Sequence, residues 1–322
     1  MTYAYLALGL FILLFGGEIL IRGAVGLSNR LKLSPVFVGV VVIGFGTSLP
    51  EMAVGVDAVM QNAPALTLGN AVGSNIANIL FILATAALLK PFERSKRALF
   101  PDGFILVVAS CGVIALGFQD VIHPWQGAVM LCILIAHMST EYYYAQRKSK
   151  LARQSATSTP DEDVFAYSDV KPMSLALALA FISLGLIALL SGAHMLIDGA
   201  SQIAREFYIS EEVIGLSVLA IGTSLPELAS AVTAALRGHP GMAYGNIFGS
   251  NLFNLLGILG VSSLVGTLNF PERVFFIDGP IMIAATLVML LFFWTGKRLS
   301  RIEGGLMLSI YIAYIYLRYT LG

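Results

Sequence analysis

Charge is scarce in this chain. Only 12% of its 322 residues are charged, whereas 57% are hydrophobic, and the mean hydropathy is +0.83. Soluble domains carry about 25% charged residues. The composition therefore excludes an ordinary soluble globular protein and predicts a chain that crosses a membrane several times. Basic and acidic residues balance at 19 each, and no basic patch indicates a nucleic-acid partner.

Cysteine is scarce as well. Cys111 and Cys132 are the only two, and both lie in apolar runs without the spacing of a metal or redox motif. We predict that both are small core hydrophobes, with no disulfide and no metal. The first residues also lack the basic stretch of a cleavable signal peptide. Residues 3–21 are long enough to span, so we expect a first membrane helix there.

Long hydrophilic stretches are rare, and their positions divide the chain. Ten apolar stretches have roughly the 17–25 residues that a spanning helix requires. We place these helices at 3–28, 34–60, 65–89, 101–118, 122–144, 173–204, 211–236, 241–268, 274–295 and 301–320. The hydrophilic stretch 146–171 reads as a solvated linker between a first unit (1–145) and a second (172–322). We predict an all-α polytopic membrane protein made of two five-helix halves.

Basic residues are distributed unevenly over the loops between these helices. One set of alternate loops holds 15 of the 19: Arg30, Lys32, Lys90, Arg94, Lys96, Arg97, Arg147, Lys148, Lys150, Arg153, Lys171, Arg237, Lys297, Arg298 and Arg301. Loops rich in Lys and Arg stay on the cytoplasmic side. We therefore expect a cytoplasmic linker and both termini outside.

One hexapeptide occurs twice. Gly-Thr-Ser-Leu-Pro-Glu spans Gly46–Glu51 and again Gly222–Glu227, each time inside an apolar stretch. A charged side chain at the bilayer centre costs roughly 2.5–3.5 kcal/mol and usually marks an ion or proton pathway. Two identical copies suggest one ion site built from two halves.

The hexapeptides belong to a longer repeat. Glu51 and Glu227 are 176 residues apart, and the same offset aligns Gly-Asn-x-x-Gly-Ser-Asn-x-x-Asn at 69–78 with its copy at 245–254. Each half has an odd number of spans, so the second copy enters the membrane upside down. Inverted repeats are typical of secondary transporters, whose sites lie near the midplane between the repeats.

The second helix is interrupted next to its glutamate. Pro50 has no N–H, so the carbonyl of Gly46 loses its helical donor. Carbonyls freed in this way are tolerated at membrane depth where they line a cavity. The same pattern surrounds the second copy, at Ala220, Gly222 and Pro226.

The motifs supply oxygen atoms of several kinds. The hydroxyls are those of Thr47, Ser48, Thr223 and Ser224, and the carboxylates are those of Glu51 and Glu227. Oxygen ligands suit hard cations, and Ca²⁺ takes 6–8 of them at about 2.3–2.6 Å. The third and eighth helices add a polar face, because Asn, Ser and Asn recur every fourth residue at 70, 74 and 78 and at 246, 250 and 254.

These residues closely resemble the paired signature repeats of the cation/calcium antiporter superfamily, in particular its compact prokaryotic sodium/calcium exchanger-like members. The resemblance covers the whole chain and implies cation sites between helices 2, 3, 7 and 8. It implies that calcium binds the carboxylates of Glu51 and Glu227 and the carbonyls of Thr47 and Thr223. It implies sodium sites that use these groups together with Gly44, Ser48, Ser74, Ala220, Ser224 and Ser250. Asn78 and Asn254 are then expected at the centre.

One position departs from the resemblance. Many sodium/calcium exchangers carry Asp where this chain has Asn254, so the centre here holds two acidic residues rather than three. This departure puts the coupled ion and its number in question more than the antiport class.

The predicted function is a secondary antiporter that exchanges calcium for sodium by alternating access, in a prokaryotic inner membrane and as a monomer. The first alternative is a proton-coupled exchanger of calcium or another divalent cation, since two buried glutamates can bind protons. A second alternative, a passive cation channel, is less favoured because channels usually build pores from symmetric subunits. An enzyme is not expected, since no His or Lys base lies in the motifs, and no cofactor is expected either.

Charged residues outside the motifs lead to smaller predictions. Glu18 and Arg22 in the first helix and His194 and Asp198 in the sixth are spaced i, i+4 and are expected to pair. Helices 1 and 6 are expected to slide across the other helices during transport. Asp57 is expected about 9 Å beyond Glu51 toward the outside, at an entrance. Asp102 and Asp278 are expected to cap the fourth and ninth helices.

Overall fold

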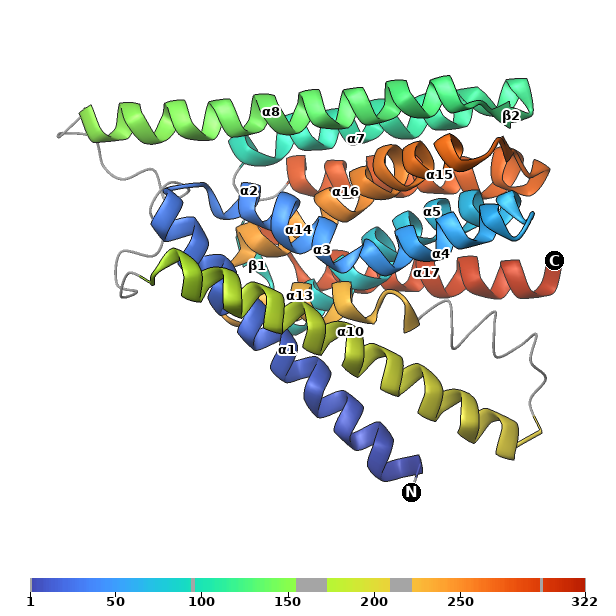
Figure 1. The fold of residues 1–322 in the computed structure, drawn as a ribbon, viewed down its shortest axis with the longest axis horizontal. Helices are drawn as coiled ribbons and strands as arrows, with labels where there is room; N and C mark the ends of the chain where they lie inside the picture. The colour runs from blue at the N-terminus through green and yellow to red at the C-terminus, as the bar shows by residue number, and fades with distance from the viewer. Residues whose placement is uncertain (1, 94–95, 155–172, 209–221, 296–297, 322) are drawn as a thin grey trace.

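The structure, a computed structural model, describes residues 2–93, 96–154, 173–208, 222–295 and 298–321 (Figure 1). The described residues are mostly helical and fall into ten segments in the predicted order. These are α1 (Thr2–Leu31); α2 (Pro35–Val38), η1 (Gly39–Gly44), α3 (Phe45–Thr47) and α4 (Leu49–Met60); α5 (Pro64–Ala77), η2 (Asn78–Leu83) and α6 (Ala84–Leu89); α7 (Lys96–Leu116) with η3 (Gly117–Gln119); α8 (Pro124–Gln154); α10 (Leu175–Glu206); α13 (Leu225–Leu236); α14 (Pro240–Leu252), η5 (Phe253–Ile258) and α15 (Leu259–Val265); η6 (Val274–Asp278) and α16 (Gly279–Thr295); and α17 (Arg301–Leu321).

Several segments are long and apolar enough to cross a membrane unaided. Among the described residues they are Thr2–Leu31, Pro64–Leu89, Leu175–Glu206, Pro240–Val265 and Val274–Trp294, with Pro35–Met60 as a bent sixth. Both termini lie at the right of Figure 1, and the end of α8 lies at the left. This arrangement agrees with an even number of crossings.

The long helices α1 and α10 form an antiparallel pair that runs obliquely to the other helices (Figure 1). Glycines set their spacing. A Cβ atom on Gly16 would lie 2.7 Å from the backbone nitrogen of Leu189, and one on Gly192 would lie 2.5 Å from that of Leu13. Small residues that let backbones approach are the usual basis of helix packing in lipid. The matched glycines of the two halves therefore bind the two helices to each other.

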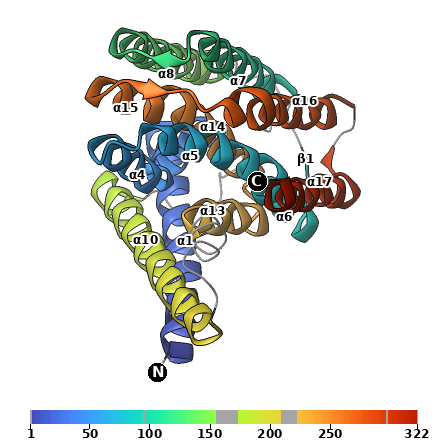
Figure 2. The same cartoon turned by 90° about the vertical axis from the view of Figure 1, so that its right-hand side faces the viewer.

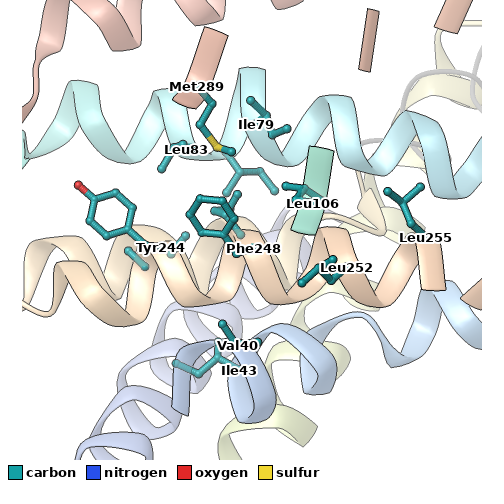
Figure 3. Packing of buried hydrophobic residues seen from close by; sticks show 14 of the residues in the cluster. Val40, Ile43, Ile79, Leu83, Leu106, Tyr244, Phe248, Leu252, Leu255 and Met289 are labelled. Atoms are coloured by element: carbon teal, nitrogen blue, oxygen red, sulfur yellow. The ribbon is translucent and has the colours of Figure 1, made fainter. Parts of the chain in front are cut away.

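The core lies around α14, whose residues from Met242 to Leu252 are buried throughout. In Figure 3, Phe248 and Leu252 of α14 lie between Val40 and Ile43 of η1 on one side and Leu83 of η2 with Met289 of α16 on the other. Figure 2 shows α7 and α8 at the outer edge of the molecule, with α15 and α16 beneath them. The motif-bearing helices thus sit inside the protein.

Wide helical turns mark the inner ends of the core helices. The segments η1, η2, η5 and η6 are π-helices, in which i→i+5 hydrogen bonds replace the α-helical pattern. The second segment also bends by 44° between α3 and α4, at Ser48. Pro50 follows directly, so the predicted interruption is confirmed.

Two short strand pairs reveal the inverted repeat. β1 (Phe92–Glu93) pairs with β4 (Arg298–Leu299), and β2 (Val121–Ile122) pairs with β3 (Leu268–Asn269). The offset between the halves maps β1 onto β3 and β2 onto β4. Each strand pair therefore maps onto the other when the halves are exchanged, as an internal two-fold axis requires.

Four smaller predictions need correction. α8 runs on through residue 154, into the predicted linker, and the rest of that linker lies outside the described residues. Asp102 lies inside α7, which begins at Lys96, so it does not cap the helix. Asp278 lies four residues into its helix, is buried, and accepts a hydrogen bond from the hydroxyl of Tyr314 (2.9 Å).

The fourth correction concerns the cysteines. Cys111 and Cys132 are free thiols but exposed, not core residues. In a membrane protein the outward face of a helix is as apolar as its inward face, so an apolar run does not distinguish the two.

Candidate cation site

The two motif glutamates occupy equivalent places at helix starts. Glu51 lies in the first turn of α4, and Glu227 lies in the first turn of α13. Free N–H groups at a helix start favour a carboxylate. Both side chains are nevertheless buried, at 2% and 1% exposure. The break before each helix thus places a carboxylate in the interior of the protein.

The structure joins the two copies of the motif. The hydroxyl of Ser48 donates a hydrogen bond to Oε1 of Glu227 over 2.9 Å. The hydroxyl of Thr47 donates to the carbonyl of Ile43 (3.0 Å) and lies 3.4 Å from Oδ1 of Asn246. Residues from both halves therefore share one polar centre, as predicted.

Other predicted ligands surround this centre. Ser250 donates its hydroxyl proton to the carbonyl of Gly44 (3.1 Å), which links α14 to η1. Ser74 and Ser224 are buried at 8% and 3% exposure. Thr223 is half-buried at the start of the second motif. Ala220 lies outside the described residues.

The central asparagines lie where the core helices widen. Asn78 begins η2, Asn254 is the second residue of η5, and both are buried. Their amide nitrogens each donate a 3.0 Å hydrogen bond, from Asn78 to Oδ1 of Asn251 and from Asn254 to Oδ1 of Asn75. Each bond crosses between the halves.

Four buried oxygen atoms of this centre have no hydrogen-bond partner. They are Oε2 of Glu51, Oε2 of Glu227, Oδ1 of Asn78 and Oδ1 of Asn254. An unpaired buried oxygen is costly and rare in proteins. Two carboxylates and two amide oxygens with free lone pairs form an acceptor set that a hard cation satisfies. No cluster of three or more His, Cys, Asp or Glu side chains occurs among the described residues, so the remaining ligands would be hydroxyl or carbonyl oxygens.

Sequence reasoning missed three asparagines of the centre. Asn75 and Asn251 hold the central amides, and Asn246 donates to the main-chain carbonyl of Glu227 (3.1 Å) and to Ser230 (2.9 Å). Asn246 therefore fastens α14 to α13 instead of facing a cation. The duplicated Gly-Ser-Asn of the repeat was the available signal for Asn75 and Asn251.

Comparison with known proteins agrees with this geometry. A family model described as "Sodium/calcium exchanger protein" matches residues 1–142 and 177–320. The chain belongs to this family. It is 32% identical to a protein designated antiporter CaxA of Alkalimonas amylolytica, with 98% of each chain covered. It is 28% identical to the sodium/calcium exchanger MaX1 of Methanosarcina acetivorans, over 98% of this chain and 97% of the other.

A solved structure has the same fold. The sodium-calcium exchanger NCX_Mj superposes with a TM-score of 0.81 at 30% identity, over 98% of this chain and 97% of that one. That structure is described as soaked with Na⁺ and Ca²⁺. The two-repeat membrane fold of the exchanger family is therefore that of this chain.

Proposed function

We propose that this chain exchanges calcium for sodium across a membrane at a single site between α4, α5, α13 and α14. The observation that carries the proposal is the set of four unpartnered buried oxygens, two of them on carboxylates. Family membership and the relatives named as sodium/calcium exchangers support the choice of ions.

Charge balance at this site explains exchange. Two carboxylates are neutralised by one Ca²⁺ or by two monovalent cations, and a buried pair that is not neutralised is costly. Calcium and sodium then compete for the same oxygens, so that one ion leaves when the other binds. Thr47, Thr223, Ser48, Ser224, Ser74, Ser250, Gly44 and Ala220 are the proposed further ligands.

The site opens to one side at a time in this proposal. α1 and α10 pack on each other along most of their length and cross the other helices obliquely. Movement of this pair against the remaining helices would change which side is covered. The site draws residues only from one chain, so a monomer is the proposed functional unit. The proposed location is a prokaryotic inner membrane, with both termini outside.

Flux measurements in proteoliposomes test the function. Vesicles loaded with sodium should accumulate radioactive calcium, and vesicles loaded with potassium or choline at the same pH should not. A pH gradient imposed without sodium separates a proton-coupled exchanger, which would take up calcium in that arm. Calcium entry without any counter-ion gradient would contradict antiport and indicate a channel.

A further inference from the structure

The two central amides are held by a relay of asparagines. Nδ2 of Asn75 donates to the main-chain carbonyl of Asn251 (3.2 Å). Oδ1 of Asn75 accepts a hydrogen bond from Nδ2 of Asn254 (3.0 Å). Oδ1 of Asn254 is then left buried and unpartnered at the centre.

This relay fixes which end of the Asn254 amide faces inward. A main-chain carbonyl can only accept, so it requires the NH₂ group of Asn75 and turns Oδ1 of Asn75 the other way. That oxygen can only accept as well, so it requires the NH₂ group of Asn254. The one remaining polar atom of Asn254 is its oxygen, the atom that a cation can bind.

We propose that Asn75 is a positioning residue that presents the amide oxygen of Asn254 to the transported cation. The inference rests on the proposed function, because it assigns a role at the same site. If the Asn254 amide turned over, its NH₂ group would face the cation and repel it. The site would lose a ligand and gain a donor where only acceptors are useful.

Asn251 holds Asn78 in a weaker way. Its Oδ1 accepts from Nδ2 of Asn78 (3.0 Å), but its own Nδ2 has no hydrogen-bond partner. The Asn78–Asn251 pair is therefore not tied to a main-chain carbonyl through Asn251, and the two amides can turn over together. Asn75 should consequently contribute more to cation binding than its repeat mate.

The test compares Asn75→Leu with Asn251→Leu, which keep similar volume and remove the amide. We expect Asn75→Leu to raise the KM for calcium about tenfold, the effect of one lost ligand worth about 1.4 kcal/mol, with a smaller change in maximal rate. Asn251→Leu should raise the KM less. Size-exclusion profiles and thermal unfolding of each variant check that the fold is retained.

An Asn254→Asp background separates positioning from simple packing. A carboxylate has an oxygen at both ends, so its orientation no longer matters. Adding Asn75→Leu to Asn254→Asp should then leave the calcium KM of Asn254→Asp nearly unchanged. An equal KM increase in both backgrounds, or none in the wild-type background, would overturn the proposal. Loss of sodium-dependent uptake by the wild-type protein would instead refute the proposed function.

A second inference comes from the contact between α1 and α13. Glu18 of α1 lies between two arginines, with Arg22 at 2.7 Å and Arg237 at 2.6 Å. Beside this group, a Cβ atom on Gly17 would lie 2.9 Å from the hydroxyl of Thr233. α1 is therefore tied closely to the C-terminal end of α13.

The repeat places the mirror image of this group on α10 and α4. The offset of 176 residues maps Glu18 onto His194, Arg22 onto Asp198, Thr233 onto Asp57 and Arg237 onto Gln61. His194 lies 3.4 Å from Asp198, and Gln61 donates a hydrogen bond to Asp57. The charge pattern is thus reversed, with a basic residue on the long helix and carboxylates around it.

Only the first of these groups is assembled here. α1 packs against α13, whereas α10 has no interface of similar extent with α4 among the described residues. The side chain of His194 is 76% exposed, and Asp57 is exposed as well. In Figure 1 the C-terminal half of α10 runs away from α4.

We infer that His194 contacts Asp57 in the opposite conformation, where α10 packs on α4 and α1 leaves α13. This inference also rests on the proposed function, since it assumes that the repeats exchange roles. The imidazole of His194 would then lie between Asp198 and Asp57, as Glu18 lies between Arg22 and Arg237 here. One contact would close one side of the membrane, and the other contact would close the opposite side.

Cysteine cross-linking tests the contact in a Cys111→Ser/Cys132→Ser parent whose exchange activity is measured first. We expect His194→Cys/Asp57→Cys to cross-link under oxidation, to stop exchange, and to recover on reduction. Glu18→Cys/Arg237→Cys should do the same from the conformation described here. Glu206→Cys/Asp57→Cys is the control and should not cross-link.

The ionic conditions sharpen this result. Conditions that increase one cross-link should decrease the other, because the two contacts belong to opposite conformations. Failure of the His194–Asp57 pair to cross-link under every ionic condition, while the Glu18–Arg237 pair does so, would overturn the inference. An inactive parent would instead point to failure of the proposed function.

Discussion

Ser48 donates a hydrogen bond of 2.9 Å to Glu227, which lies 179 residues further along the chain. The bond crosses from one repeat to the other. Its donor belongs to the same hexapeptide as Glu51, so the two buried carboxylates are parts of one centre. Most consequences of the structure for transport follow from this junction.

The two carboxylates should be indispensable. We expect Glu51→Gln and Glu227→Gln each to reduce sodium-dependent calcium uptake about 100-fold or more, because removing one partner of a buried charge arrangement costs about 3–5 kcal/mol. Uptake into sodium-loaded proteoliposomes measures the effect. Glu206→Gln, an exposed carboxylate at the end of α10, is the matched control and should keep full activity. Normal uptake by either motif variant would show that the cation binds elsewhere.

Ser48→Ala should have a graded effect. The substitution removes one hydrogen bond to Glu227 and one proposed oxygen ligand but leaves both charges. A neutral hydrogen bond contributes about 1 kcal/mol, so we expect the KM for sodium or calcium to rise about fivefold. The dependence of uptake on each ion measures this. An unchanged KM for both ions would remove Ser48 from the site.

Gly249 should tolerate no side chain. A Cβ atom there would lie 2.3 Å from the main-chain oxygen of Val40 and 2.7 Å from its Cα, so α14 and η1 would have to separate. Overpacking of this kind typically costs about 1–3 kcal/mol. We expect Gly249→Ala to lower both the thermal unfolding temperature in detergent and the exchange rate. Gly112→Ala is the control, because no described atom lies within 4 Å of that position on α7. Equal unfolding temperatures for the two variants would contradict this packing.

The sequence predicted the helices and the two motifs, because both signals are local. A span is a run of apolar residues, and a duplicated motif is visible by alignment alone. The asparagine relay was not predicted, since it depends on which of several amides in one motif face each other across the repeats. Asp278 was misassigned for a related reason: its partner Tyr314 lies 36 residues away, whereas a helix cap is a local feature.

The inward and outward faces of helices were also beyond the sequence. Cys111 and Cys132 read as core residues because both faces of a membrane helix are apolar. The long reach of α8 was missed because its last turns are hydrophilic, and a hydrophilic stretch can be a linker or a helix that leaves the bilayer. Composition sets the length of the apolar part of a helix and not its end.

His239 should make the protein less stable in mild acid. It lies in the turn between α13 and α14, where burial together with the nearby charges of Lys90 and Arg237 lowers its pKa below the ordinary value, while Glu18 acts in the opposite direction. The native protein therefore binds fewer protons at this group than the unfolded chain does. Stability from the neutral imidazole is present above the unfolded pKa of about 6.5 and is lost as the pH falls below it. We expect the unfolding temperature to fall between pH 7.5 and pH 5, and His239→Gln, which cannot take up a proton, to lose less over this interval. The same decrease in both proteins would assign the acid sensitivity to other groups.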